Sequence, residues 1–293
     1  MQKKRILILA NGSRDIDYKI TKMVVDYLKK KEIELYSEEN VVSVFKDIKE
    51  YKNEDVFLCI IIGGDGTMMS YVQKYKDHNF NVFGINAGRV GCIYDGTTEN
   101  FKDKLDLILD GKYFIEKRNT VKCILNFKDR KPIETIGFNE VTLSRGNYIK
   151  LLHINLKING IHSTSFYADG VLVATTTGST AYNLSCNGPL LLPEAKNFVI
   201  TPLCPQSRLV TSLVVNDNDI IDINISSTKI DKDDEGNNPV VFIDGNERYE
   251  IDENTELVLT KSHYSLNIVR TDKDSSLFEP LIKVSQTPTT NLK

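Results

Sequence analysis

A nearly continuous apolar run, Val56 to Ile62, leads directly into the glycine-rich loop Gly63-Gly64-Asp65-Gly66-Thr67. Such an uninterrupted run predicts a strand buried on both faces, as in a parallel sheet covered by helices. Glycines permit positive φ angles here and lack the Cβ atoms that keep a polyanion away from backbone amides. We expect Thr67 to cap a helix over residues 68–75, whose first free amides then form an anion site.

Asp65 is the acidic residue of this loop. A carboxylate that faces phosphate groups needs a cation or a proton to move, which favours phosphoryl transfer with Mg²⁺ over anion storage. A tight strand-to-helix turn capped by Asp65 is the simpler alternative, because short glycine motifs often match by chance. The loop is not a Walker A sequence, since no Gly-Lys-Ser/Thr follows it.

The composition is that of a globular protein and excludes several other classes. The chain of 293 residues is long enough for two domains, with 41% hydrophobic and 26% charged residues. Its net charge of −3 gives no reason to expect a nucleic-acid partner. Without an apolar run of membrane-spanning length or a signal peptide, we expect a cytoplasmic protein with no membrane partner. Five cysteines without C-x-x-C spacing and four scattered histidines predict reduced thiols and no protein-bound metal cluster.

Strand-like and helix-like segments alternate in the first part of the chain. Strands are predicted over residues 5–10, 56–62 and 82–86, and helices over 15–31, 41–50, 68–75 and 102–109. Alternation of this kind predicts parallel βαβ units with ligands at the carboxyl ends of the strands. We therefore predict an α/β domain over residues 1–115, with Asp65 at such an end and residues 272–293 packing back on it.

From about Phe114 the hydrophobic pattern becomes two-fold, which predicts an all-β, sandwich-like domain over residues 116–271. Asn159-Gly160 and Asp244-Gly245-Asn246 are predicted hairpin turns, and residues 228–239 a solvated loop without assigned function. The strand-like segments are 121–127, 133–144, 151–158, 171–175, 220–225, 240–243, 256–260 and 265–269.

A run rich in hydroxyl groups, Thr175 to Ser185, follows Ala168-Asp169-Gly170 in this domain. Buried hydroxyls need hydrogen-bond partners, which a polar ligand supplies. Tyr182 offers a flat ring for a purine, and Ser179, Thr180 and Ser185 offer hydrogen bonds. The alternative is a Ser/Thr-rich turn followed by a helix start.

Two adjacent polar residues, Asn139 and Glu140, interrupt an otherwise apolar strand. Adjacent strand residues point to opposite faces, so at least one of the two faces the core or a cleft. An uncompensated carboxylate there is costly, so Glu140 is either exposed or in contact with a ligand.

Together these motifs resemble the NAD kinase family. The glycine loop, the segment Gly84-Ile85-Asn86-Ala87-Gly88, the pair Asn139-Glu140 and the run Thr177 to Ser185 after Asp169-Gly170 match the family in order and spacing over about residues 60–250. Lipid kinases and phosphofructokinases share the glycine loop, whereas the Gly-Ser-Thr-Ala-Tyr run is more specific.

The resemblance implies an ATP-dependent kinase, acting with Mg²⁺ or another divalent metal, that phosphorylates the 2′-hydroxyl of the adenosine ribose of NAD to give NADP. It implies that Asp65 is the base and that Asn139 and Glu140 bind ribose hydroxyls, while Asp169 binds the nicotinamide end. It also implies a homodimer or homotetramer. The full set of implied binding residues is Gly63, Gly64, Asp65, Gly66, Thr67, Asn139, Glu140, Asp169, Thr177, Gly178, Ser179, Thr180, Ala181, Tyr182, Asn183, Leu184 and Ser185, with Lys150, Tyr167 and Asn246 as weaker candidates.

The chain departs from the family pattern at four places near the implied acceptor pocket. Thr176 replaces a proline, Asn187 a glycine, Gln206 a histidine and Cys92 a phenylalanine. Two other functions therefore stay open. One is a related kinase with a nucleoside or lipid acceptor, although no strongly amphipathic basic segment for lipid is visible. The other is a non-catalytic NAD(P)-binding sensor, which would not need the acidic residue of the loop.

Overall fold

The computed structural model describes residues 3–87, 93–147, 150–226 and 238–272. The chain divides into two compact units. The first contains the described residues up to Arg118 and those from Leu266 onward, and the second contains the described residues from Asn119 to Ser265.

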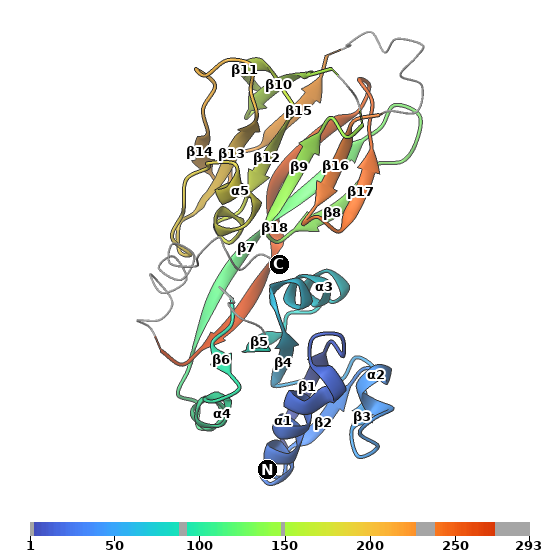
Figure 1. Cartoon of the computed structure of the whole chain (residues 1–293), viewed down its shortest axis with the longest axis vertical. Helices are drawn as coiled ribbons and strands as arrows, with labels where there is room; N and C mark the ends of the chain where they lie inside the picture. Colours follow the sequence, from blue (N-terminus) through green and yellow to red (C-terminus); the bar gives the residue numbers. More distant parts are fainter. Residues whose placement is uncertain (1–2, 88–92, 148–149, 227–237, 273–293) are drawn as a thin grey trace. The chain divides into compact units, whose positions relative to one another are not determined.

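The first unit is an α/β domain built on a parallel sheet with the strand order β3-β2-β1-β4-β5 (Figure 1). The end of β18 and the short β6 also pair in parallel with β5. The elements are β1 (Arg5–Ala10), η1 (Ile16–Tyr18), α1 (Lys19–Lys29), β2 (Glu34–Ser37), α2 (Glu39–Val42), β3 (Lys49–Glu50), β4 (Leu58–Gly63), α3 (Asp65–Lys74), β5 (Asn81–Asn86), β6 (Gly96–Thr97) and α4 (Phe101–Leu109).

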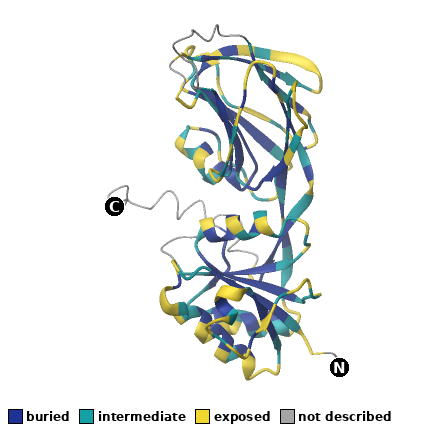
Figure 2. Ribbon diagram, turned by 90° about the vertical axis from the view of Figure 1, so that its right-hand side faces the viewer, coloured by how far each residue is buried: buried dark blue, intermediate teal, exposed yellow. Residues whose placement is uncertain are grey.

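Both faces of the central strands are covered, as their continuous apolar sequences predict. Every residue of β4 is buried (Figure 2). Ile6 and Ile8 of β1 share a core with Leu28 of α1 and Leu105 of α4. The strand order reverses between β1 and β4, so the loop after β4 lies at the switch point where open α/β sheets bind ligands.

Two predictions for this unit are wrong in detail. The helix expected over residues 41–50 is only the short α2, after which the chain returns to the sheet as β3. Its apolar residues Val41 and Ile48 are buried in the core, which their spacing allows without a continuous helix. The sequence interpretation also missed β2, which pairs with the edge of β1.

The second unit is β-rich and consists of two sheets over one core. One sheet has the antiparallel order β14-β13-β12-β9-β16-β17, and the other contains β11-β10-β15-β18 together with β7 and β8. Side chains from both sheets, such as Val141 and Ile154, belong to the same buried cluster. The elements are β7 (Phe114–Asn126), β8 (Ile133–Gly137), β9 (Glu140–Ser144), β10 (Leu152–Ile158), β11 (Ile161–Ala168), β12 (Gly170–Ala174), η2 (Gly178–Thr180), α5 (Tyr182–Ser185), β13 (Asn197–Leu203), β14 (Leu213–Asn216), β15 (Ile221–Ile225), β16 (Val240–Ile243), β17 (Glu247–Glu250) and β18 (Glu256–Arg270).

Both predicted hairpin turns are confirmed. Asn159 and Gly160 have φ angles of 53° and 75° between β10 and β11, and Asp244 and Gly245 have 49° and 68° between β16 and β17. Positive φ at both central residues is the signature of a type I′ turn.

Several strand boundaries differ from the prediction. The segment 133–144 is two strands in different sheets, because β8 pairs with β7 and β9 pairs with β12. The segments 256–260 and 265–269 are parts of one long strand, β18. Strands β11, β13, β14 and β17 were not predicted. The predicted loop 228–239 and the tail after Asp272 lie almost entirely outside the described residues.

Candidate active site

The glycine loop joins β4 to α3 with a geometry that differs from the prediction. Helix α3 begins at Asp65, and Gly64 is its N-cap with an extended backbone (φ −108°, ψ 179°). Thr67 is therefore not the cap; it is buried inside the first turn, and its own N–H donates to the Gly64 carbonyl at 2.8 Å. None of the three loop glycines has a positive φ angle, so that part of the argument is wrong.

The glycines are needed for space instead. A Cβ atom on Gly63 would lie 2.4 Å from Oγ1 of Thr67, whereas one on Gly64 or Gly66 would meet no atom of the described residues within 4 Å. Gly63 thus lets the first turn of α3 close against β4. Gly64 and Gly66 leave the backbone at the helix N-terminus open to a ligand, where free amides and the helix dipole favour negative charge.

The difference in space between Gly63 and Gly66 allows a test of whether a ligand approaches the loop backbone. Gly66→Ala is expected to keep or raise the melting temperature, because alanine favours the helix by about 1 kcal/mol and its Cβ meets no neighbour in the described part of the chain. If phosphate groups approach this backbone, the same change lowers kcat/KM. Gly63→Ala, as the matched control, should lower the melting temperature. Steady-state kinetics and thermal unfolding of both variants measure this; full activity of Gly66→Ala would contradict close approach.

Asp65 is half-buried in the first turn of α3. Beside it, the Tyr94 hydroxyl donates to the Gly64 carbonyl at 2.6 Å. Burial, followed by the nearby charge of Asp65, raises the pKa of Tyr94, so this hydroxyl keeps its proton and braces the loop. The Tyr94 ring lies over Gly84, where a Cβ would come within 2.5 Å of it. The sequence interpretation missed Tyr94, although Gly84 belongs to a recognised motif.

In the second unit, Asn139 lies in the turn between β8 and β9, and Glu140 is the first residue of β9. Thr175 holds one side of this turn. The Thr175 hydroxyl donates to the Phe138 carbonyl at 2.6 Å, and its N–H donates to the Asn139 carbonyl at 2.8 Å. Gly178 packs directly on this turn, since a Cβ there would lie 1.9 Å from the Asn139 oxygen. The structure therefore brings two of the sequence motifs together.

Asp244 holds the other side of the turn. Its carboxylate accepts hydrogen bonds from the backbone N–H groups of Phe138, Asn139 and Glu140 at 2.8, 2.7 and 3.0 Å. Its own N–H donates to the Glu140 carbonyl at 3.0 Å. The sequence interpretation treated Asp244 only as part of a hairpin turn, because no local pattern connects it to the turn at Asn139.

Glu140 is buried, with 8% of its surface exposed. Burial raises the pKa of its carboxyl to about 7; Asp244 adds to this rise, and a hydrogen bond from the Tyr182 N–H opposes it. Its Oε2 atom has no hydrogen-bond partner among the described residues. Of the two alternatives for Glu140, exposure is thus wrong, and contact with a ligand remains.

The hydroxyl-rich run forms η2 and α5, and its side chains fall into two groups. Ser179 and Asn183 are buried and bonded internally: Ser179 donates to the Thr176 carbonyl at 2.7 Å, and Asn183 accepts from Thr201 at 2.7 Å. Thr177 and Gly178 are also buried. Tyr182 and Ser185 are exposed, and Thr180, Ala181 and Leu184 are half-buried. Part of the run supports the turn, and part of it is accessible to a ligand.

The remaining predicted residues lie elsewhere in this unit. Asp169 forms an ion pair with Arg145 at 2.7 Å. The exposed Tyr167 stacks on His153 with ring centres 4.5 Å apart. Asn246 is exposed in the β16–β17 turn, and the exposed Lys150 follows two residues outside the described part of the chain.

Two of the departures from the family pattern have a visible structural basis. Asn187 has a φ of 59°, a left-handed conformation that asparagine tolerates better than most residues and that glycine adopts freely. Thr176 is buried and lies 3.5 Å from the Pro193 carbonyl oxygen. Gly88 and Cys92 are outside the described residues.

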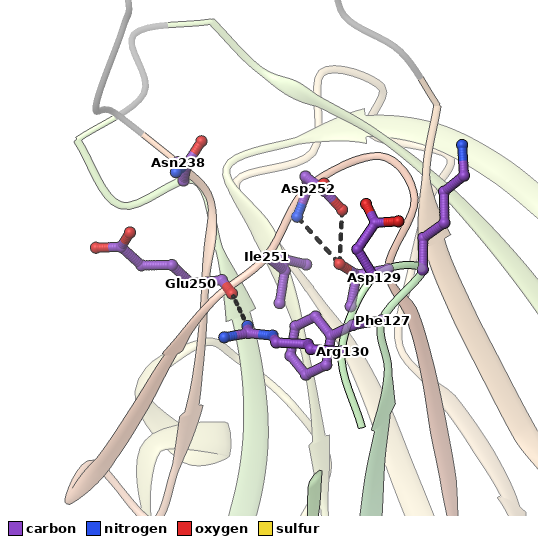
Figure 3. A pocket seen from close by; sticks show the side chains of 9 residues that line it. Phe127, Asp129, Arg130, Asn238, Glu250, Ile251 and Asp252 are labelled. Carbon is purple, nitrogen blue, oxygen red and sulfur yellow. Dashed lines mark hydrogen bonds between the residues drawn. The ribbon is translucent and has the colours of Figure 1, made fainter. Parts of the chain in front are cut away.

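A pocket of about 340 Å³ lies in the second unit and contains none of the predicted site residues. Figure 3 shows Arg130 over the Phe127 ring, at 3.5 Å, with a hydrogen bond to the Glu250 carbonyl at 3.3 Å. Among the described residues there is no group of three or more His, Cys, Asp or Glu that could hold a metal ion. Nor do they include a helix long and apolar enough to cross a membrane.

Comparisons with known proteins agree with these motifs. Residues 6–113 match the model of the ATP-NAD kinase N-terminal domain, and residues 138–271 match that of the C-terminal domain. The chain is 30% identical to an NAD kinase of Thermoanaerobacter sp. (strain X514) over 95% of this chain and 97% of the relative. It is 31% identical to an NAD kinase of Clostridium botulinum (strain Kyoto / Type A2), over 92% of this chain and 93% of the relative.

Solved structures share the fold. A yeast NADH kinase complexed with NADH has a TM-score of 0.83 and 21% identity, covering 99% of this chain and 90% of its own. An NAD kinase from Archaeoglobus fulgidus in complex with ATP has a TM-score of 0.75 and 22% identity, covering 97% of this chain and 100% of its own. From these matches over nearly its whole length, the chain belongs to the NAD kinase family.

Proposed function

We propose that this protein transfers the γ-phosphoryl group of ATP to the 2′-hydroxyl of the adenosine ribose of NAD, giving NADP and ADP. The observation that carries the proposal is Asp65, a half-buried carboxylate in the first turn of α3, next to the open backbone of Gly64 and Gly66. A carboxylate beside an anion site is suited to accept a proton from a hydroxyl nucleophile.

Phosphoryl transfer depends mainly on alignment and charge neutralisation. We assign to Asp65 the positioning and deprotonation of the 2′-hydroxyl. Asn139 and Glu140 bind ribose hydroxyls, for which Glu140 retains an unused buried acceptor, Oε2. The exposed ring of Tyr182 offers a stacking surface for adenine.

A divalent metal fits this donor set as a partner of ATP. Mg²⁺ keeps several of its waters and is held largely by substrate phosphates, so it can enter with ATP while the Asp65 carboxylate keeps its role as the base. When bound, the metal neutralises charge on the phosphates. The protein supplies the loop amides and the acidic group.

The test is incubation of the protein with ATP, Mg²⁺ and NAD, with NADP measured by an NADP-specific dehydrogenase. We expect NADP to accumulate with ADP in equal amounts. Turnover only with another nucleoside or with a lipid would favour a related kinase. Tight binding of NAD or NADP without ATP consumption would identify a sensor instead.

We also propose that the protein acts in the cytoplasm as a homodimer or homotetramer. Free thiols at the described Cys59, Cys123, Cys186 and Cys204 support a reducing compartment. Membership of the family supports self-association. Sedimentation velocity of the purified protein measures the oligomeric state, and a monomer at micromolar concentration would contradict it.

A further inference from the structure

We propose that Asp244 is a positioning residue of the dinucleotide site, which fixes the turn that presents Asn139 and Glu140. The proposal deepens the proposed function and rests on the assignment of these two residues to the ribose. Asp244 itself is assigned no contact with substrate; it acts through the backbone that it holds.

Three backbone N–H groups converge on the Asp244 side chain. Oδ1 of Asp244 accepts from Asn139 and Glu140, and Oδ2 accepts from Phe138. Phe138 and Asn139 lie between β8 and β9, so their N–H groups are outside the ladders that pair these strands. The Asp244 carboxylate gives three consecutive amides an acceptor, and bonds to a charged acceptor are the stronger kind.

The β16–β17 hairpin itself does not need a carboxylate at position 244. Asp244 and Gly245 form a type I′ turn, in which Asn-Gly is at least as favourable as Asp-Gly. Asparagine, however, has only one acceptor oxygen, and its NH₂ group would face the Phe138 N–H. The requirement for two acceptor oxygens therefore comes from the turn at Asn139.

The Asp244 carboxylate also has an electrostatic cost for the folded protein. Asp244 places a negative charge near Glu140, which is buried and whose pKa is already raised by desolvation. Repulsion between two neighbouring carboxylates opposes folding, and such arrangements are retained where they position groups for function.

The two sides of the turn are held independently. Asp244 binds its N–H groups, while Thr175 binds the carbonyls of Phe138 and Asn139. With the peptide units fixed from both directions, the Cα–Cβ bonds of Asn139 and Glu140 point in fixed directions. Loss of the hydrogen bonds to the Asp244 carboxylate should therefore make the turn more mobile, while the bonds to Thr175 keep it formed.

The experiment compares Asp244→Asn with Gly245→Asn, a control in the same hairpin that keeps the carboxylate and a residue tolerant of positive φ. For Asp244→Asn we expect the KM for NAD to rise about tenfold or more, with a much smaller change for ATP. We also expect the decrease of kcat/KM for NAD at acidic pH to occur at a lower pH than in the wild type. The reason is that loss of the negative charge of Asp244 lowers the pKa of Glu140. Gly245→Asn should keep the wild-type KM for NAD and the wild-type pH dependence.

Hydrogen exchange separates this proposal from the proposed function. If Asp244 holds the turn, the amides of residues 138–140 exchange faster in Asp244→Asn than in the wild type, whatever the substrate is. Unchanged exchange, or an unchanged KM for NAD and pH profile in an active variant, would overturn the positioning role. Absence of NADP formation by the wild type would instead overturn the proposed function.

Discussion

Replacing Asp65 with asparagine is expected to lower kcat by at least about 10²-fold, while the fold and the binding of NAD are retained. Asparagine has nearly the same shape but cannot accept the proton of the 2′-hydroxyl, and general-base catalysis is typically worth about 10² to 10⁴ in rate. NADP formation under saturating ATP and NAD measures the rate, and calorimetric titration measures the affinity for NAD.

The matched control is Asp103→Asn. Asp103 is exposed and lies in the first turn of α4, as Asp65 lies in the first turn of α3. Both substitutions remove a charge that interacts favourably with a helix N-terminus, an effect of about 0.3–1 kcal/mol on stability. We expect similar small losses of stability but a loss of turnover only at position 65. A wild-type rate in Asp65→Asn would show that this carboxylate is not the base.

The second large effect is expected at Glu140, because burying its ionised carboxylate lowers the stability of the folded protein. The pKa of Glu140 is about 7 in the folded protein, compared with 4.5 for an ordinary glutamate. The folded state thus binds this proton more tightly than the unfolded state. This tighter proton binding contributes about 3 kcal/mol to the free energy of unfolding. The contribution is fully present below pH 4.5 and is lost as the pH rises through 7.

Glu140→Gln should therefore unfold at nearly the same urea concentration as the wild type at pH 4.5 but be more stable at pH 8, by up to about 3 kcal/mol. The same variant should have a higher KM for NAD, because an ionised acceptor for ribose hydroxyls is gone. The exposed Glu253, changed to glutamine, is the control and should show neither effect. A stability difference that does not grow between these pH values would contradict the raised pKa.

Glu140 also predicts a pH dependence of catalysis. Protonation replaces the ionised acceptor by a neutral carboxyl, so kcat/KM for NAD should rise with pH through about 7 in the wild type. Glu140→Gln should lose this limb while keeping any limb due to Asp65. The two groups are distinguished by measuring kcat/KM in buffers of constant ionic strength. The buffers should cover about three pH units centred on the Glu140 pKa of about 7.

Features with a local physical cause could be predicted from the sequence. The continuous apolar run of β4 required a strand covered on both faces, and the structure has one in a parallel sheet. Asn159-Gly160 specified its hairpin because both residues tolerate positive φ, which only a few residue types do. The chemical motifs placed Asp65 directly after β4, at the strand end where α/β sheets bind ligands.

The tertiary structure alone decided how the second half of the site is built. Asp244 accepts hydrogen bonds from the amides of Phe138 and Glu140, which precede it in the sequence by 106 and 104 positions. Gly178, in the hydroxyl-rich run, packs against the Asn139 carbonyl. For the same reason the break between β8 and β9 was missed: apolar alternation continues through it, and only pairing with different strands separates the two. Sequence periodicity reports the environment of each side chain, whereas hydrogen bonds between distant backbone groups exist only once the sheets have packed and fixed the loops at their ends.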